Sequence, residues 1–116
     1  MRYMLLIYTN PTDVLDEAAR ATQMAGYWEF GQKIAASGEL VVGEELQAVD
    51  VATTVRVRSG ATTTTDGPFA ETKEVLGGFY MVDVTDLDRA IEIAAQIPDS
   101  TRGSIEVRPI VDHSQG

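Results

Sequence analysis

The alternation of apolar and polar positions divides the chain into short strand-like segments and two longer helical segments. Residues 3–8 form a wholly apolar run just before Pro11, and its shortness predicts a buried strand. From residue 53 to 59 valines alternate with threonine and arginine, and the turn signal Ser59-Gly60 predicts that residues 61–65 return as a hairpin partner. The same pattern predicts further strands at residues 40–46, 78–84 and 104–111.

Two segments have apolar residues at helical spacing. We expect the first helix over residues 13–37, capped by Thr12 or Asp13 and ended by Gly38. Its expected apolar side consists of Val14, Ala18, Ala21, Ala25 and Trp28. We expect the second over residues 86–97, with Thr85 and Asp88 as a pair resembling a capping box and Pro98 closing it. Its expected apolar positions are Leu87, Ala90, Ile91, Ala94 and Ile97.

This order of elements predicts an α+β fold: a ferredoxin-like split βαβ subunit with an inserted β-hairpin. At this length, residues 1–116 are expected to form a single domain. Two helices can cover only one face of the sheet, yet residues 3–8 and 79–84 are apolar on both faces. We therefore expect a homodimer in which two sheets pack face to face; the alternative is that the central hairpin folds over the second face.

Composition and charge exclude several classes of function. The chain has no cysteine and one histidine, which excludes thiol chemistry and disulfides and makes a transition-metal site improbable. Its formal net charge of −9 would repel a polyphosphate backbone, so nucleic-acid binding is not expected. The sequence contains neither a membrane-spanning run nor a signal-peptide core, so we expect no membrane contact and a cytoplasmic location.

Cofactor motifs are also missing from the sequence. It has no Walker-type loop, dinucleotide fingerprint or nucleophile elbow, and we therefore predict no cofactor. The pair Gly77-Gly78 is better explained as a strand bulge than as a phosphate-binding loop. Asp66, Glu71 and Glu74 lack a recognised ligand spacing, so we predict no metal site.

The segment at residues 66–74, DGPFAETKE, has an unusual signature. Asp-Gly-Pro is turn chemistry, and Phe69 is expected to pin the turn to the core. We expect the Asp66 carboxylate to fix the turn by accepting hydrogen bonds from the backbone N–H groups of Phe69 and Ala70. Three carboxylates and one lysine could instead bind a polar ligand or relay a proton. The structural interpretation is a well-specified loop with a solvated Glu–Lys pair.

The chain resembles the YCII-related domain family, in the branch named after its DGPF motif. The resemblance rests on DGPFAETKE and the following VLGGFY, on the opening YMLLIY, and on the segments GEEL and TTVRVR and the ending GSIEVRP. It covers nearly the whole chain. It implies a dimeric α+β barrel built on a ferredoxin-like subunit, and no particular reaction. Some relatives accompany extracytoplasmic-function sigma factors, which implies a regulatory setting.

The chain departs from the wider family at two positions. Other members carry a histidine on the first helix and an aspartate near the end of the second, and this pair suggests enzymatic function. Counting along the chain places these positions at Tyr27 and Ile97, so we expect the pair to be absent. The single histidine, His113, lies in the C-terminal tail, where we expect it to be exposed. An enzyme that uses a His–Asp pair is therefore not supported.

Two functions are open at this stage. The first is a small-molecule protein whose ligand lies in the barrel cleft, with or without acid–base chemistry. The candidate residues are Asp66 or Glu71 as base, Lys73 or Arg108 as anion holder, and Tyr8 or Tyr80 as hydrogen-bond donor. The second is a non-catalytic regulatory or interaction module. The lack of a complete catalytic constellation favours the second slightly, and the fold analogy favours the first.

Overall fold

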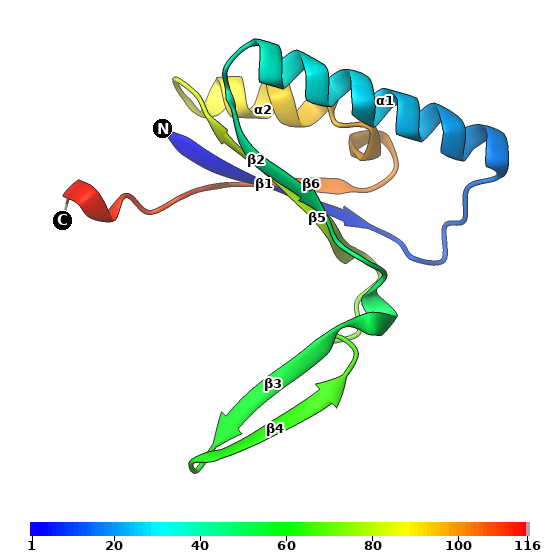
Figure 1. Cartoon of the computed structure of the whole chain (residues 1–116), viewed down its shortest axis with the longest axis vertical. Coiled ribbons are helices and arrows are strands. Elements are labelled where there is room, and N and C mark those ends of the chain that lie inside the picture. Colours follow the sequence, from blue (N-terminus) through cyan, green and yellow to red (C-terminus); the bar gives the residue numbers. More distant parts are fainter. Residues whose placement is uncertain (116) are drawn as a thin grey trace.

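The computed structural model describes residues 1–115, which form a four-stranded sheet, two helices and a separate two-stranded hairpin (Figure 1). The strands are β1 (Arg2–Thr9), β2 (Leu40–Glu45), β3 (Thr53–Arg58), β4 (Ala61–Asp66), β5 (Val75–Asp83) and β6 (Ser104–Pro109). The helices are α1 (Glu17–Ala36) and α2 (Leu87–Gln96), with short 3-10 helices η1 (Val49–Val51), η2 (Pro98–Thr101) and η3 (His113–Gln115). The predicted α+β class is confirmed, and every predicted strand and helix is present.

The main sheet has the order β2-β5-β1-β6, and all neighbouring strands are antiparallel. Because side chains alternate along a strand, Tyr3, Leu5 and Ile7 point to the buried side of β1. They join Val82 and Val84 of β5 in the core. Between Ile7 and Tyr8 the register with β5 shifts by one residue, which confirms the predicted bulge at Gly77-Gly78.

Helix α1 packs on the sheet with a different face from the one expected. Asp16 is its N-cap and accepts a hydrogen bond from the Ala19 backbone N–H at 2.7 Å, so the expected caps Thr12 and Asp13 were wrong. The buried residues are Phe30 and Ile34, whereas Trp28 is 70% exposed. Of the other residues expected on the apolar side, all are exposed: Val14, Ala18, Ala21 and Ala25. Small apolar residues occur all round this helix, so periodicity alone did not select the packed face.

The N-cap of helix α2 lies one residue after the predicted cap. The Asp86 carboxylate, not Thr85, accepts the hydrogen bond of the Arg89 backbone N–H, at 2.9 Å. Ala90, Ile93 and Ala94 are buried, while Leu87 and Ile91 are about half exposed. Ile97 is buried, and the chain leaves the helix at Pro98 as predicted.

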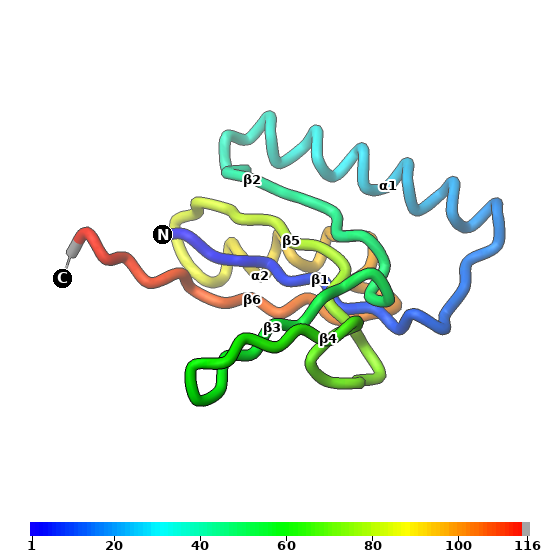
Figure 2. Tube along the Cα trace, turned by 60° about the horizontal axis from the view of Figure 1, so that its bottom comes forward, coloured from blue at the N-terminus to red at the C-terminus, as the bar shows by residue number. Residues whose placement is uncertain are grey.

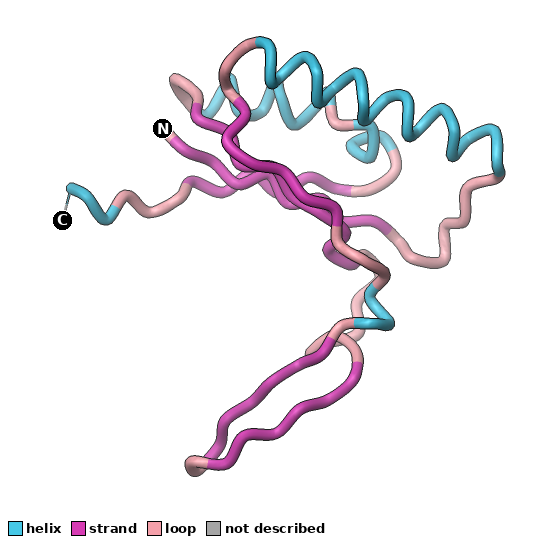
Figure 3. Tube along the Cα trace, in the orientation of Figure 1, coloured by secondary structure: helices cyan, strands magenta, loops and turns pink. Residues whose placement is uncertain are grey.

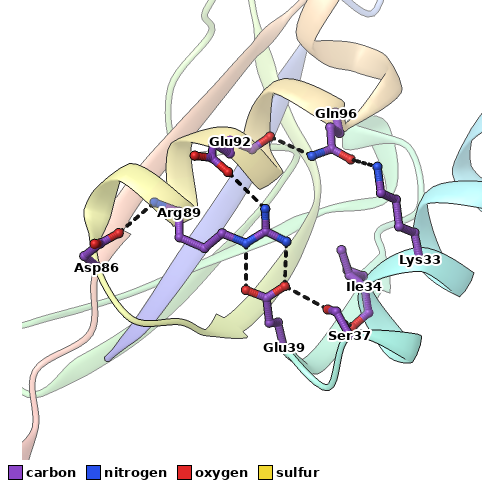
Figure 4. A network of polar contacts seen from close by, with 8 residues as sticks. All are labelled: Lys33, Ile34, Ser37, Glu39, Asp86, Arg89, Glu92 and Gln96. Atoms are coloured by element: carbon purple, nitrogen blue, oxygen red, sulfur yellow. Dashed lines mark hydrogen bonds and ion pairs between the residues drawn. The ribbon is translucent and has the colours of Figure 1, made fainter.

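A polar network joins the end of α1 and the start of β2 to α2 (Figure 4). The Arg89 guanidinium binds both carboxylate oxygens of Glu39, at 2.8 and 2.7 Å, and its third contact is Glu92. Ser37 donates to the same Glu39 carboxylate at 2.8 Å. These hydrogen bonds, of which the largest effect comes from Arg89, lower the pKa of Glu39 from 4.5 to about 2.

Both helices lie on one face of the main sheet, and the hairpin β3–β4 lies on the other side of it (Figure 1 and Figure 2). Figure 3 shows the hairpin separated from the sheet by loops and the short helix η1. The hairpin projects away from the second face, and neither of its strands joins the main sheet. On that open face Met4, Leu6 and Tyr8 are half-buried, as are Phe79 and Met81.

Candidate functional site

A large open cavity lies between the first half of α1 and the β2–β5 edge of the sheet. Its volume is about 1090 Å³, and its walls come from α1, from the segment after β2 that leads into η1, from the start of β5, and from η2. Because Phe30 and Ile34 anchor only the second half of α1 in the core, the first half spans the space above this edge. The cavity is of the size that small-molecule sites in proteins have.

At one wall the carboxylate of Asp99 is nearly buried, with 7% of the residue exposed. Oδ1 accepts hydrogen bonds from Gln23 Nε2 at 2.6 Å and from Arg102 Nε at 2.8 Å. Oδ2 accepts one from the Tyr27 hydroxyl at 2.5 Å. A buried charge needs paired and hydrogen-bonded partners, and this carboxylate has three donors, one of them cationic.

Local sequence explains how these side chains meet. Gln23 and Tyr27 are four residues apart on α1 and therefore lie on one face of the helix. Pro98 ends α2 and begins η2, where Asp99 and Arg102 are three residues apart and share one turn. Gly26 lies against this turn, since a Cβ added there would be 3.2 Å from Pro98 Cγ. A glycine at this point therefore lets α1 approach η2 closely.

Arg102 extends the cluster towards the loop before α1. Its Nη1 pairs with Asp13 Oδ2 at 2.9 Å, while its Nε binds Asp99. The Arg102 side chain is three-quarters buried, and its guanidinium bridges two acidic groups from distant parts of the chain. This bridge ties the segment between β1 and α1 to η2 at the edge of the cavity.

Two tyrosines define the chemistry of the cavity. Burial, followed by the hydrogen bond to Asp99, raises the pKa of Tyr27 far above its ordinary value, so its hydroxyl stays protonated and donates. Burial, followed by the charge of Glu45, also raises the pKa of Tyr80. The Tyr80 ring meets Phe30 edge to face, with centroids 5.1 Å apart. Both tyrosines are therefore neutral hydrogen-bonding groups at physiological pH.

Gly43 on β2 has no side chain, and this leaves room for the Tyr80 ring. The two residues are directly opposite in the register of β2 and β5, and a Cβ at Gly43 would overlap the Tyr80 ring. Within residues 1–115 the Tyr80 hydroxyl makes no hydrogen bond, and it is not enclosed. The donor and acceptor capacity of this hydroxyl is therefore not used by the described part of the chain.

Of the candidate residues chosen from the sequence, the structure places Tyr80 in the cavity and the others elsewhere. Tyr8 and Arg108 belong to the open face of the sheet, where the Tyr8 hydroxyl lies 3.4 Å from Glu106 Oε1 and Arg108 is opposite Met4. Asp66 ends β4, and Glu71 and Lys73 lie in the loop after it; all three are exposed.

Backbone groups of Gly67, and not the Asp66 carboxylate, hold the turn after β4. The Gly67 backbone N–H donates to the Ala52 carbonyl at 2.7 Å, and the Thr54 hydroxyl donates to the Gly67 carbonyl at 2.8 Å. Gly67 has a φ of +95°, which explains a glycine there. Within residues 1–115 the Asp66 carboxylate accepts no hydrogen bond, so the expected bonds from Phe69 and Ala70 are wrong. Phe69 is 79% exposed, so it does not pin the turn to the core.

The Asp99 cluster is the part of the site that sequence reasoning missed. Ile97, the position expected to correspond to the family's aspartate, is a core residue, whereas Asp99 two positions later is the acid that faces Tyr27. The spacing of Gln23 and Tyr27 indicates that they share one face of a helix, and the spacing of Asp99 and Arg102 indicates that they share one turn. Their meeting across more than seventy residues was not visible in the sequence.

Two further findings concern metals and membranes. Within residues 1–115 the structure brings together no group of three or more His, Cys, Asp or Glu side chains that could hold a metal ion. Among the same residues, neither helix has the length and apolar character required to span a bilayer.

Comparisons with known proteins give a family and a fold. The family model of the YCII-related domain matches residues 1–114. An uncharacterized protein of Rhizobium meliloti (strain 1021) is 39% identical over 87 residues, which is 73% of this chain and 70% of that protein. A solved 5-chloro-2-hydroxyhydroquinone dehydrochlorinase from Burkholderia phenoliruptrix AC1100, in complex with 2,5-dihydroxybenzoquinone, has a TM-score of 0.57 and 13% identity, covering 99% of this chain and 98% of its own. At that identity the last likeness concerns the fold alone.

Proposed function

The chain belongs to the YCII-related domain family, and on that premise we propose that it is a homodimeric small-molecule-binding protein whose ligand occupies the cavity between α1 and the β2–β5 edge. The observation that carries the proposal is the Asp99 cluster. A nearly buried carboxylate with three donors holds Tyr27 and Arg102 at the wall of a cavity of about 1090 Å³. Such a cluster preorganises the wall, which reduces the entropy that a ligand loses on binding.

The proposed ligand is a small hydroxylated aromatic compound. The Tyr80 ring offers an apolar surface, and its accessible hydroxyl offers one hydrogen-bond donor and acceptor. A planar ring with polar substituents fits both features. The dehydrochlorinase that shares this fold was solved with a dihydroxylated quinone, which supports the choice of this chemical class for the first probes.

A titration followed by ¹⁵N–¹H correlation spectra tests the site. With catechol and hydroquinone as probes, we expect amide shifts at Gly43 and Gly77, which line the cavity, and none at Gly60 in the hairpin turn. Tyr80→Phe should weaken binding roughly three- to tenfold, the effect of one hydrogen bond. Tyr8→Phe removes a hydroxyl on the open face and is the matched control. Shifts confined to the open face, or equal losses in both variants, would rule out this cavity as the site.

The alternative function is an enzyme that uses acid–base chemistry on such a compound. The Tyr27–Asp99 hydrogen bond of 2.5 Å is the observation in its favour. Two features weigh against it. The pKa of Tyr27 lies far above neutral, so its hydroxyl does not act as a base near pH 7. Both Asp99 oxygens already accept hydrogen bonds from Gln23, Tyr27 and Arg102, so neither oxygen is left without a partner within the protein. Chromatography of the probes after long incubation distinguishes the two functions, since an enzyme releases a changed compound.

The proposed subunit is ferredoxin-like, a single domain that pairs into a dimeric α+β barrel, in the DGPF branch of the family. The sheet order β2-β5-β1-β6 with both helices on one face supports the subunit, and the apolar open face supports the dimer. Leu6 lies on that face, opposite Phe79 on β5. We expect sedimentation velocity to give a dimer for the native chain and a monomer for Leu6→Asp; a monomeric native chain would disprove the dimer.

The same proposal includes the other candidate residues and the cellular setting. In the proposed dimer, Tyr8 and Arg108 lie at the subunit interface, and the exposed Asp66, Glu71 and Lys73 remain available to a ligand or a partner. A regulatory role would then follow from ligand binding, with the acidic surface of the dimer as the contact to another protein. We propose a cytoplasmic setting for this role.

A further inference from the structure

The β3–β4 hairpin has its apolar face exposed and its polar face partly covered. Val55 and Val57 are 59% and 56% exposed. On the opposite face Thr54 and Arg56 are half-buried, because the loop after β4 lies against them: the Thr54 hydroxyl donates to the Gly67 carbonyl, and Arg56 Nη2 lies 3.5 Å from the Phe69 carbonyl. A sheet that faces water has the reverse arrangement.

The hairpin also lacks support from the rest of its own chain. Its two strands form a sheet by themselves, and every residue of β4 is exposed. A two-stranded hairpin alone in water is marginally stable at best. The radius of gyration is 16.4 Å, whereas a compact domain of this length has about 13 Å. The projecting hairpin therefore has the features of a segment that is completed by another molecule.

The position of the hairpin indicates which molecule this is. Figure 1 and Figure 2 place it on the side of the main sheet that carries no helix. That side presents the apolar open face with Leu6 and Phe79. A second copy that covers the open face must lie beside the hairpin, and two-fold symmetry then brings each hairpin to the other copy.

Charge also favours the second copy as the occupant. Within residues 53–66 there are two arginines and one aspartate, so this arm has a formal charge of +1 while the whole chain has −9. The arm is thus a basic projection on an acidic protein. Arg56 and Arg58 lie on the face opposite the valines, so this charge acts as a longer-range attraction between the arm and the acidic body of a second copy, and it offsets part of the repulsion between two acidic chains.

We propose that the β3–β4 hairpin is a dimerisation arm that packs its Val55–Val57 face onto a second copy of the chain. The inference rests on the homodimer proposed above and names a contact beyond the sheet faces. It also links the dimer to the ligand site. The segment that joins β2 to the hairpin, including Val49 and Asp50 of η1, lines the cavity, so docking of the arm would hold this wall in place.

Sedimentation equilibrium on charge variants tests the arm. The double variant Val55→Asp with Val57→Asp should raise the dimer dissociation constant at least about tenfold, because it replaces two apolar side chains of the contact with carboxylates that would be buried without partners. Ala61→Asp adds a carboxylate on the other face of the same hairpin, opposite Arg58, and should leave the constant within about twofold. An unchanged constant in the double variant overturns the arm while leaving the sheet-face dimer intact. A monomeric native chain overturns both, and the probe titration still reports independently on the cavity.

Crosslinking provides a measurement that does not depend on destabilising the hairpin. The chain has no cysteine, so Val57→Cys gives a single site for benzophenone maleimide. On irradiation we expect covalent dimers, with markedly fewer from Ala61→Cys. Adducts confined to the same chain, or equal dimer yields from both positions, would show that the valine face does not meet a second copy.

Discussion

Removal of the Asp99 carboxylate is the sharpest test of the cluster at the cavity wall. Asp99→Ala leaves Gln23, Tyr27 and the Arg102 Nε without their acceptor, at a position where the native residue is only 7% exposed. Breaking a buried, charged pair by removing one partner costs about 3–5 kcal/mol. Arg102 keeps its contact with Asp13, which places the expected loss near the lower end, about 3 kcal/mol.

Asp99→Asn separates charge from hydrogen bonding. The asparagine has the same shape, its Oδ1 still accepts from Gln23 and Arg102, and its amide donates to the Tyr27 hydroxyl, which then acts as acceptor. Only the charge assistance is lost, so we expect a decrease of about 1–2 kcal/mol in the free energy of unfolding. The predicted order of stability is therefore native, then Asn, then Ala.

Urea denaturation followed by far-ultraviolet circular dichroism measures these changes. Trp28 is 70% exposed and would report poorly by fluorescence. Asp66→Ala is the matched control, because that carboxylate is exposed and makes no hydrogen bond within residues 1–115; its cost should stay below about 0.5 kcal/mol. If Asp99→Ala unfolds within about 1 kcal/mol of the native chain, or costs no more than Asp66→Ala, the cluster does not hold the cavity wall.

Three further changes have defined outcomes. Glu39→Gln should lower the free energy of unfolding at pH 7 by about 1–2 kcal/mol, which is less than the pKa change alone would suggest because the Arg89 side chain is one-third exposed. Since folding lowers the pKa of Glu39 from 4.5 to about 2, the native carboxylate makes its full contribution above pH 4.5. Urea titrations should show this contribution disappear as the pH falls towards 2. Gly103→Ala should lower the melting temperature by more than about 5 °C, because its Cβ would overlap the Tyr8 carbonyl, and a change of under a degree in calorimetry would contradict the close approach. His113→Ala should leave probe binding unchanged in the same titration, because this exposed residue lies in the tail and is not part of the cavity wall.

Element type and order were predictable because they depend on local properties of the chain. The apolar run at residues 3–8, the alternation before Ser59-Gly60 and the stop at Pro98 all correspond to features of the structure. Strand period, turn chemistry and the missing N–H of proline act over a few residues. The α+β class follows from that order. Cap residues were missed by one to four positions, because several adjacent Asp and Thr residues near each start can accept the same hydrogen bond.

The buried face of α1 could not be predicted from the local sequence. Its apolar residues occur on all sides, so the helix has two plausible stripes. Packing against the sheet selects the buried stripe, because Phe30 packs against Tyr80 and Ile34 joins the core. Trp28, a strong candidate for burial from its side chain alone, ended on the opposite side.

The chain's amino acids alone determined an acidic, cysteine-free α+β protein with an inserted hairpin and an apolar second sheet face. Only the tertiary structure decided that Asp99 meets Tyr27 and Gln23, and that the hairpin projects with its valines exposed. The physical reason is the separation along the chain between the residues that interact. Periodicity and capping concern neighbours within about one helical turn, whereas burial of a carboxylate beside a tyrosine 72 positions away depends on how the whole sheet and both helices pack.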